Sequence, residues 1–170
     1  PKTSSAASDV YKRQAGYDIQ KNETVDDLEF LTSLARYLQK EHGFDPEKTF
    51  SAGMSNGGDM SYLLGCQAPN VFKAIAPITG CMMGWIYDSC DQNQPLPVFQ
   101  VHGTADNTTY YDGDENNRDQ WGAYMGVEKT IDLWVKRNQC KSVVIDTLPD
   151  IDPKDGSIVI SHKYIDGLNG

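Results

Sequence analysis

The chain has 170 residues, in which 15 Lys and Arg face 24 Asp and Glu, so its formal net charge is −9. Hydrophobic residues make up 39% of the sequence and recur in periodic blocks, which is typical of a globular domain and argues against a disordered chain. The acidic balance argues against nucleic acid or an anionic membrane as a partner, because phosphate groups are bound through Lys and Arg. No run of 18 apolar residues is present, so the sequence predicts no membrane-spanning helix.

The first 14 residues, PKTSSAASDVYKRQ, have neither helix nor strand periodicity. Residues 4–14 resemble the in-frame translation of a sequencing adapter, so we expect residues 1–14 to be a non-native segment outside the fold. The alternative is an ordinary N-terminal tail.

The predicted elements alternate between helices and apolar strands along the rest of the chain. Amphipathic or apolar periodicity predicts helices at about 25–41, 60–68 and 126–138. Short apolar runs predict strands at 49–52, 73–78, 97–101, 143–148 and 157–164. Residues 80–96 read as an irregular excursion and residues 103–122 as a loop. This alternation predicts an α/β fold with a parallel sheet.

A Gly-x-Ser-x-Gly motif, Gly53-Met54-Ser55-Asn56-Gly57, stands between a predicted strand and a predicted helix. Such a turn strains the backbone of its central residue, and we expect a Cβ at either Gly53 or Gly57 to collide with neighbouring elements. It would expose the Ser55 hydroxyl at the carboxyl edge of the sheet, where the Asn56 N–H can donate to an oxyanion. The alternative is a glycine-rich turn with a solvated serine.

A nucleophilic serine needs a base, and the base needs an orienting acid. Asp106 follows the strand predicted at 97–101, which places it at the same edge of the sheet as the serine. The order Ser then Asp agrees with the order of triad residues in α/β-hydrolases. The alternative is that Asp106 is a turn-former or a helix cap.

The sequence contains three histidines, and none is a good candidate for the base. His162 follows Asp106 in the chain, but it lies within a strand pattern instead of a loop. We expect His102 to fix the loop of Asp106 by hydrogen bonding. His42 reads as a residue at the C-terminus of a helix, where the dipole favours it.

With these motifs placed, the chain resembles the α/β-hydrolase family of poly(3-hydroxybutyrate) depolymerases, feruloyl esterases and acetylxylan esterases. The resemblance covers about 17–170 and rests on segments 25–30, 45–46, 53–58, 74–77, 101–106 and 152–157. It implies a mostly parallel sheet flanked by helices, Ser55 as nucleophile, Asp106 as triad acid, and no metal or organic cofactor.

The resemblance also indicates what the sequence lacks. The family carries its catalytic histidine in a Gly-Gly-His-x-Trp-Pro-Gly segment, which is absent here, as are the early strands of the fold. We therefore expect residues 15–170 to be an incomplete catalytic domain with little turnover of its own.

The expected function of the parent protein is that of an exported (extracellular or periplasmic) serine esterase. Its substrates would be polyhydroxyalkanoate or plant cell-wall polysaccharide esters. The alternatives are a serine peptidase of the same fold and a non-catalytic binding domain.

Cys66, Cys81, Cys90 and Cys140 form an even set, and in an exported protein disulfides are expected. Four cysteines allow three pairings, among which the spacing does not choose. The family resemblance favours Cys90 with Cys140, and Cys66 reads as a small buried hydrophobe. No Cys-x-x-Cys occurs, so no zinc site is expected.

The predicted loop carries acidic and aromatic residues. Residues 112–116 imitate the start of a calcium loop, but Asn117 and Ala123 stand where such a loop needs Gly and Glu, so we expect a solvated acidic loop. The nearby aromatics are expected to pack under the loop, with a pocket for an aryl ester or a sugar as the alternative; they are Tyr110, Tyr111, Trp121 and Tyr124.

Overall fold

The structure is a computed structural model that describes residues 26–90 and 94–168. The segment expected to be non-native, 1–14, lies outside the described residues. The helices are α2 (Asp27–His42), the short 3₁₀ helix η2 (Pro46–Lys48), α3 (Asn56–Gln67), α4 (Gly84–Ser89) and α5 (Val127–Asn138). The strands are β1 (Ser51–Met54), β2 (Ile75–Ile78), β3 (Met82–Met83), β4 (Gly113–Asp114), β5 (Tyr124–Met125), β6 (Ser142–Thr147) and β7 (Ile160–Ile165).

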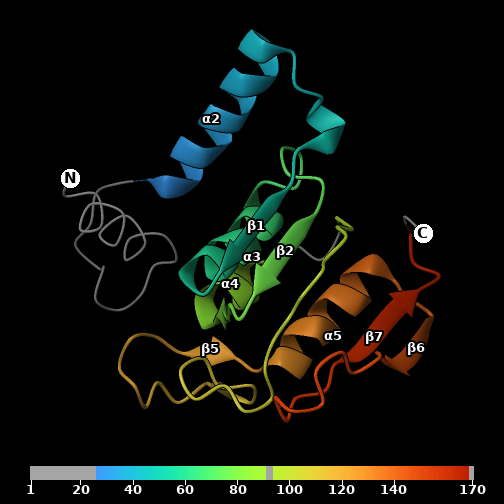
Figure 1. Ribbon diagram of the computed structural model, residues 1–170. Helices are drawn as coiled ribbons and strands as arrows, with labels where there is room; N and C mark the ends of the chain where they lie inside the picture. Colours follow the sequence, from blue (N-terminus) through green and yellow to red (C-terminus); the bar gives the residue numbers. More distant parts are fainter. Residues whose placement is uncertain (1–25, 91–93, 169–170) are drawn as a thin grey trace, which may run out of the picture.

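A small parallel sheet lies at the centre of the fold (Figure 1). β1 pairs with β2 in parallel, with Ser51 opposite Ile75. On the other side of β2, Val98 and Val101 form parallel bridges, so residues 97–101 add a third parallel stretch. The strand predicted at 97–101 is therefore present only as two isolated β-bridges and not as a continuous strand. The parallel sheet and the α/β class are confirmed.

The core forms where α3 packs on this sheet. Nine residues of α3 are buried, because the helix carries apolar and small residues on most of its surface. A Cβ on Gly65 would lie 2.9 Å from the side chain of Ile75, so glycine allows close approach of the helix to the sheet. From the other direction, α5 contributes Leu133 and Trp134 to the same cluster.

Two antiparallel units accompany the parallel sheet. One has the strand order β3-β5-β4. Through β3 and α4, residues 82–89 of the segment predicted as irregular, 80–96, form regular structure. The other is the hairpin of β6 and β7, in which Ser142 pairs with Ile165. Both strands of the hairpin were predicted, but they pair only with each other among the described residues, and their side chains are mostly exposed.

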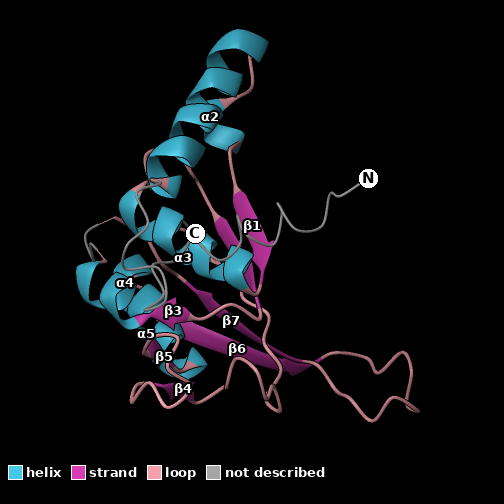
Figure 2. Cartoon of the chain, turned by 90° about the vertical axis from the view of Figure 1, so that its left-hand side faces the viewer, coloured by secondary structure: helices cyan, strands magenta, loops and turns pink. Residues whose placement is uncertain are grey.

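Helix α2 stands away from the sheet in both views (Figures 1 and 2). The helix is well capped, because the Asp26 carboxylate accepts the Glu29 N–H at 2.8 Å and Gly43 closes it at φ 68°. Its apolar stripe is only partly covered: Leu28, Leu31 and Ala35 pack against the core cluster, while Leu34 is 40% exposed. Among the described residues no strand pairs with the outer edge of β1.

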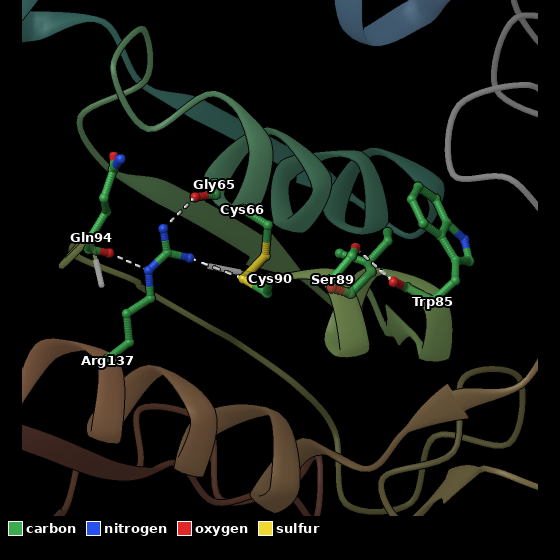
Figure 3. The surroundings of a disulfide bond; sticks show 8 residues. Gly65, Cys66, Trp85, Ser89, Cys90, Gln94 and Arg137 are labelled. Atoms are coloured by element: carbon green, nitrogen blue, oxygen red, sulfur yellow. Dashed lines mark hydrogen bonds between the residues drawn. A yellow bond between two sulfur atoms is a disulfide. The ribbon is translucent and has the colours of Figure 1, made fainter. Parts of the chain in front are cut away.

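A disulfide joins Cys66, near the end of α3, to Cys90, just after α4 (Figure 3). The predicted Cys90–Cys140 pairing is therefore wrong. Cys66 is buried in the core, as expected, but it is a disulfide partner. The packing of α4 against α3 brings Cys66 and Cys90 together. Cys140 instead follows α5, where it is free and partly exposed, while Cys81 is free and buried.

Arg137 of α5 lies against this disulfide and is only 1% exposed (Figure 3). Its guanidinium donates to the carbonyl oxygens of Gln94 and Gly65, and one nitrogen lies 3.0 Å from the Cys90 Sγ. The same group lies 4.7 Å from the ring centre of Trp134. Arg137 thereby ties α5 to α3, a role that its position in the sequence did not indicate.

Candidate active site

Ser55 occupies the turn between β1 and α3 in a conformation that few residues adopt. Its φ is 54° and its ψ is −123°, and its exposed side chain makes no capping hydrogen bond to α3. The backbone compensates for this strain, because Ser55 N–H donates to Ile78 O at 2.9 Å while Ser55 O accepts from Gly58 and Asp59. The turn thus presents the hydroxyl at the carboxyl end of β1. Asn56 begins α3, so its N–H lies at the positive end of the helix dipole.

The glycines around this turn have different roles. A Cβ on Gly53 would lie 2.4 Å from the carbonyl carbon of Gly57, so the expected collision is present there. For Gly57 the expectation was wrong, because a Cβ would meet nothing within 4 Å. The close approach is instead between Gly58 and Gly80, where a Cβ on Gly80 would lie 2.7 Å from Gly58 Cα. Gly80 follows β2, so this crossing holds α3 against the end of the neighbouring strand.

Asp106 lies in the loop after the third parallel stretch, and backbone N–H groups of that loop bind one of its two carboxylate oxygens. Oδ1 accepts the N–H groups of Thr108 and Thr109, both at 2.9 Å. These two bonds, with a smaller contribution from His102, lower the pKa of Asp106 below its ordinary 3.8. The side chain is 20% exposed, and Oδ2 lies 3.9 Å from His102 Nε2, which is too long for a hydrogen bond. The two loop amides therefore bind Oδ1 and not Oδ2.

His102 closes the loop of Asp106. Its Nε2 donates to Thr109 O at 2.8 Å, because a carbonyl can only accept, and this fixes the proton on Nε2. The ring is buried and meets Tyr111 edge-on, with ring centres 6.2 Å apart. These contacts agree with the loop-fixing role expected for His102 and leave it unsuited to be a mobile base.

The other two histidines lie elsewhere in the fold. His42 ends α2 beside the rings of Tyr37 and Phe44, and His162 is exposed in β7 opposite Ile145. Among the described residues, His102 is the sole histidine within 4.0 Å of a carboxylate. The structure thus places a nucleophile candidate and an acid candidate at the same edge of the sheet, and none of the histidines in the described ranges, 26–90 and 94–168, lies in position to act as a base for them.

The aromatic residues of segment 103–122 and their neighbours pack under the loop, as the first of the two interpretations expected. Tyr124 is fully buried, stacks on Trp121 with ring centres 4.8 Å apart, and accepts the Tyr110 N–H at 3.0 Å. The acidic loop is solvated at Asp112 and Glu115, as expected, whereas Asp114 is 2% exposed and pairs with Arg118 at 3.0 Å. No group of three or more His, Cys, Asp or Glu in the part of the chain that is described is arranged to hold a metal ion.

A parallel sheet, a strained serine between a strand and a helix, and a carboxylate after the third parallel stretch of that sheet define the α/β-hydrolase class. The model of the prolyl oligopeptidase family matches residues 8–135, and the chain belongs to that family.

Curated relatives of this chain carry the names of esterases. The chain is 31% identical over 120 residues to feruloyl esterase B of Piromyces equi, and the aligned region covers 68% of this chain and 22% of the relative. It is 29% identical over 155 residues to a bifunctional acetylxylan esterase/xylanase of Neocallimastix patriciarum, covering 89% of this chain and 22% of the relative. It is 28% identical over 93 residues to a probable feruloyl esterase C of Aspergillus niger, covering 54% and 33% respectively. The chain thus spans a fifth to a third of the length of these relatives.

The resemblance to feruloyl and acetylxylan esterases is therefore confirmed. None of the described helices has the length and apolar character needed to cross a membrane.

Proposed function

We propose that the protein containing this chain is a serine esterase that cleaves feruloyl or acetyl esters of plant cell-wall polysaccharides. The observation that carries the proposal is Ser55 in its strained turn at the start of α3, in a chain whose relatives are named as feruloyl and acetylxylan esterases. Polyhydroxyalkanoate is the less favoured substrate, because none of the relatives described above is named for it.

In the proposed reaction a base takes the proton of Ser55 while Oγ bonds to the ester carbonyl carbon. The carbonyl oxygen becomes an oxyanion, to which the Asn56 N–H donates. The C–O bond to the alcohol then breaks, the base returns its proton to the alcohol, and an acyl-enzyme remains. Water, activated by the same base, hydrolyses this ester and restores Ser55. Asp106 orients the base through Oδ2 and stabilises its charged form.

We propose that the base is a histidine outside residues 15–170 and that these residues are one part of a larger hydrolase domain. Two features support this: the locations of His42, His102 and His162, and the uncovered edge of β1. Beside that edge lies an open cavity of about 740 Å³, lined by apolar residues of α2, β1 and α3 together with Ser55 and Asn56, and a complete domain would cover part of this apolar lining. Residues 15–170 alone should therefore hydrolyse esters poorly. Turnover by this segment equal to that of the complete gene product would refute the proposal.

A serine peptidase of the same fold is the second candidate, and the name of the matching family favours it. The complete gene product separates the two candidates when it is assayed with methyl ferulate, acetylated xylan and peptide anilides. We expect ester hydrolysis that Ser55→Ala abolishes and no release of the anilide. Anilide cleavage lost in Ser55→Ala would establish the peptidase, and a protein inactive on all three would favour a binding domain.

We also propose that the protein is exported, because a buried disulfide persists in oxidising compartments. Fractionation of the source cells tests this. Recovery of the protein only from the cytoplasm would contradict it.

A further inference from the structure

Asp59 is a buried carboxylate directly beneath the candidate nucleophile. It lies in the first turn of α3, is 3% exposed, and its own N–H donates to Ser55 O at 3.1 Å. A carboxylate removed from water costs several kcal/mol unless it is hydrogen-bonded. The side chain therefore serves a structural purpose at this place, and its contacts show which one.

The Asp59 carboxylate bonds to the segment that follows β2. Oδ1 accepts the backbone N–H of Cys81 at 2.6 Å, a bond strengthened by the negative charge of the acceptor. The same segment contains Gly80, which crosses Gly58 at van der Waals distance, and Thr79, which has a φ of 48°. Three residues of irregular backbone are thus held against the first turn of α3.

This segment is also hydrogen-bonded to the parallel stretch that precedes the candidate acid. Thr79 N–H donates to Val101 O at 2.8 Å, five residues before Asp106. Hydrogen bonds, together with the backbone of residues 79–81, therefore link the Ser55 turn through Asp59 and Cys81 to the edge where the Asp106 loop begins. Burial, and then the charge of Asp59, raise the pKa of the Cys81 thiol well above its ordinary value, so Cys81 stays a neutral thiol beside the carboxylate.

We propose that Asp59 is a positioning residue for the reaction: through the Cys81 N–H it sets the placement of Ser55 relative to Asp106. The inference rests on the proposed function. Asp59 does not touch the substrate or the reacting atoms. It acts by holding two strand ends in one register, and a displacement of about 1 Å between reacting groups can cost a hundredfold in rate.

Three substitutions test the positioning role in the complete gene product. Asp59→Ala removes the acceptor and should lower kcat for methyl ferulate about a hundredfold, with KM changed by less than about threefold. Asp59→Asn keeps an acceptor oxygen and should restore kcat to within about tenfold of the wild type. Asp59→Glu keeps the charge but shifts the oxygen by one methylene, and it should stay impaired. The proposal is overturned if Asp59→Ala keeps the wild-type kcat, or if the Asn variant is as impaired as the Ala variant.

Asp114→Ala is the matched control, because Asp114 is also a buried carboxylate that accepts a backbone N–H, that of Asp119 at 3.1 Å. It should lower the melting temperature while the folded enzyme keeps its kcat. An equal loss of kcat in Asp114→Ala and Asp59→Ala would reduce the role of Asp59 to general stability and would overturn the proposal.

A readout without substrate separates this inference from the proposed function. In the 170-residue chain, amide hydrogen exchange over residues 54–60 should be faster in Asp59→Ala than in Asp59→Asn, whereas Asp114→Ala should leave that segment unchanged. If no ester is hydrolysed, the proposed function fails and exchange alone tests whether Asp59 holds the turn. Exchange over residues 54–60 that is the same in Asp59→Ala as in the wild type would overturn the positioning role. If the Ala variant does not fold, wild-type exchange in Asp59→Glu would overturn it instead.

Discussion

Removing the disulfide should destabilise the protein by an amount that follows from the loop it closes. Cys66 and Cys90 are 24 residues apart, and a loop of that length corresponds to about 3.4 kcal/mol at 25 °C in the chain-entropy model. For a chain of this size the melting temperature should fall by about 10 °C in the Cys66→Ala/Cys90→Ala variant. The matched control is Cys140→Ala, because this thiol is free and partly exposed and should change stability by less than about 0.5 kcal/mol.

The assay is urea unfolding of both variants and of the wild type, with and without reductant, together with peptide mapping of the oxidised protein. The wild type should yield a linked Cys66–Cys90 peptide and should lose stability on reduction, whereas the double variant should be insensitive to reductant. A linked Cys90–Cys140 peptide would refute the reasoning. A double variant as stable as the oxidised wild type would do so as well.

Three further predictions concern the elbow, the acid loop and the buried ring. Gly53→Ala should lower the free energy of unfolding, measured in urea, by about 1–3 kcal/mol, because the new Cβ meets the Gly57 backbone. Gly57→Ala should lower it much less, and an equal loss in the two variants would contradict this. Because the pKa of Asp106 is lowered, its stabilisation is complete above pH 3.8 and is lost as the pH falls through the lower folded-state value. Asp106→Asn should therefore flatten the acid limb of a stability–pH curve, and an unchanged limb would count against the loop contacts. Burial raises the pKa of Tyr124 to about 12, so the free energy of unfolding should fall as the pH rises above about 10. The absorbance of its tyrosinate should then appear together with the loss of circular dichroism. Ionisation of Tyr124 at pH 10 in the folded state would contradict its burial.

The local patterns of the sequence predicted most of the helices and the parallel strands, because their apolar periodicity reflects the surfaces they bury. The helix expected at 25–41 is α2, Asp27–His42, and the helix expected at 126–138 is α5, Val127–Asn138. The Gly-x-Ser-x-Gly motif marked the turn, since a sharp strand-to-helix turn has few sequence solutions. The helix expected at 60–68 begins four residues earlier, at Asn56, because the turn itself opens α3.

The contacts between distant segments could not be predicted from the sequence. The disulfide depends on how α4 packs on α3, and no spacing of cysteines encodes that packing. Arg137 and Asp59 read as ordinary charged residues, yet both are buried, because their partners include backbone groups contributed by remote segments. Asp114 is buried as well, although its partners, Arg118 and the Asp119 N–H, lie within five residues of it. The sequence did not single out Gly80 either, because a side chain is excluded there only by the backbone of Gly58, which the folded chain brings against it.

The most direct test of the proposed function is to trap the nucleophile in the complete gene product. The protein is treated with a fluorophosphonate probe, digested and analysed by mass spectrometry, with Ser55→Ala as the control and methyl ferulate as a competitor. The account predicts a single adduct on the peptide that carries Ser55, lost in the variant and slowed by the competitor. An adduct on another serine, or ferulate release that persists in Ser55→Ala, would contradict it.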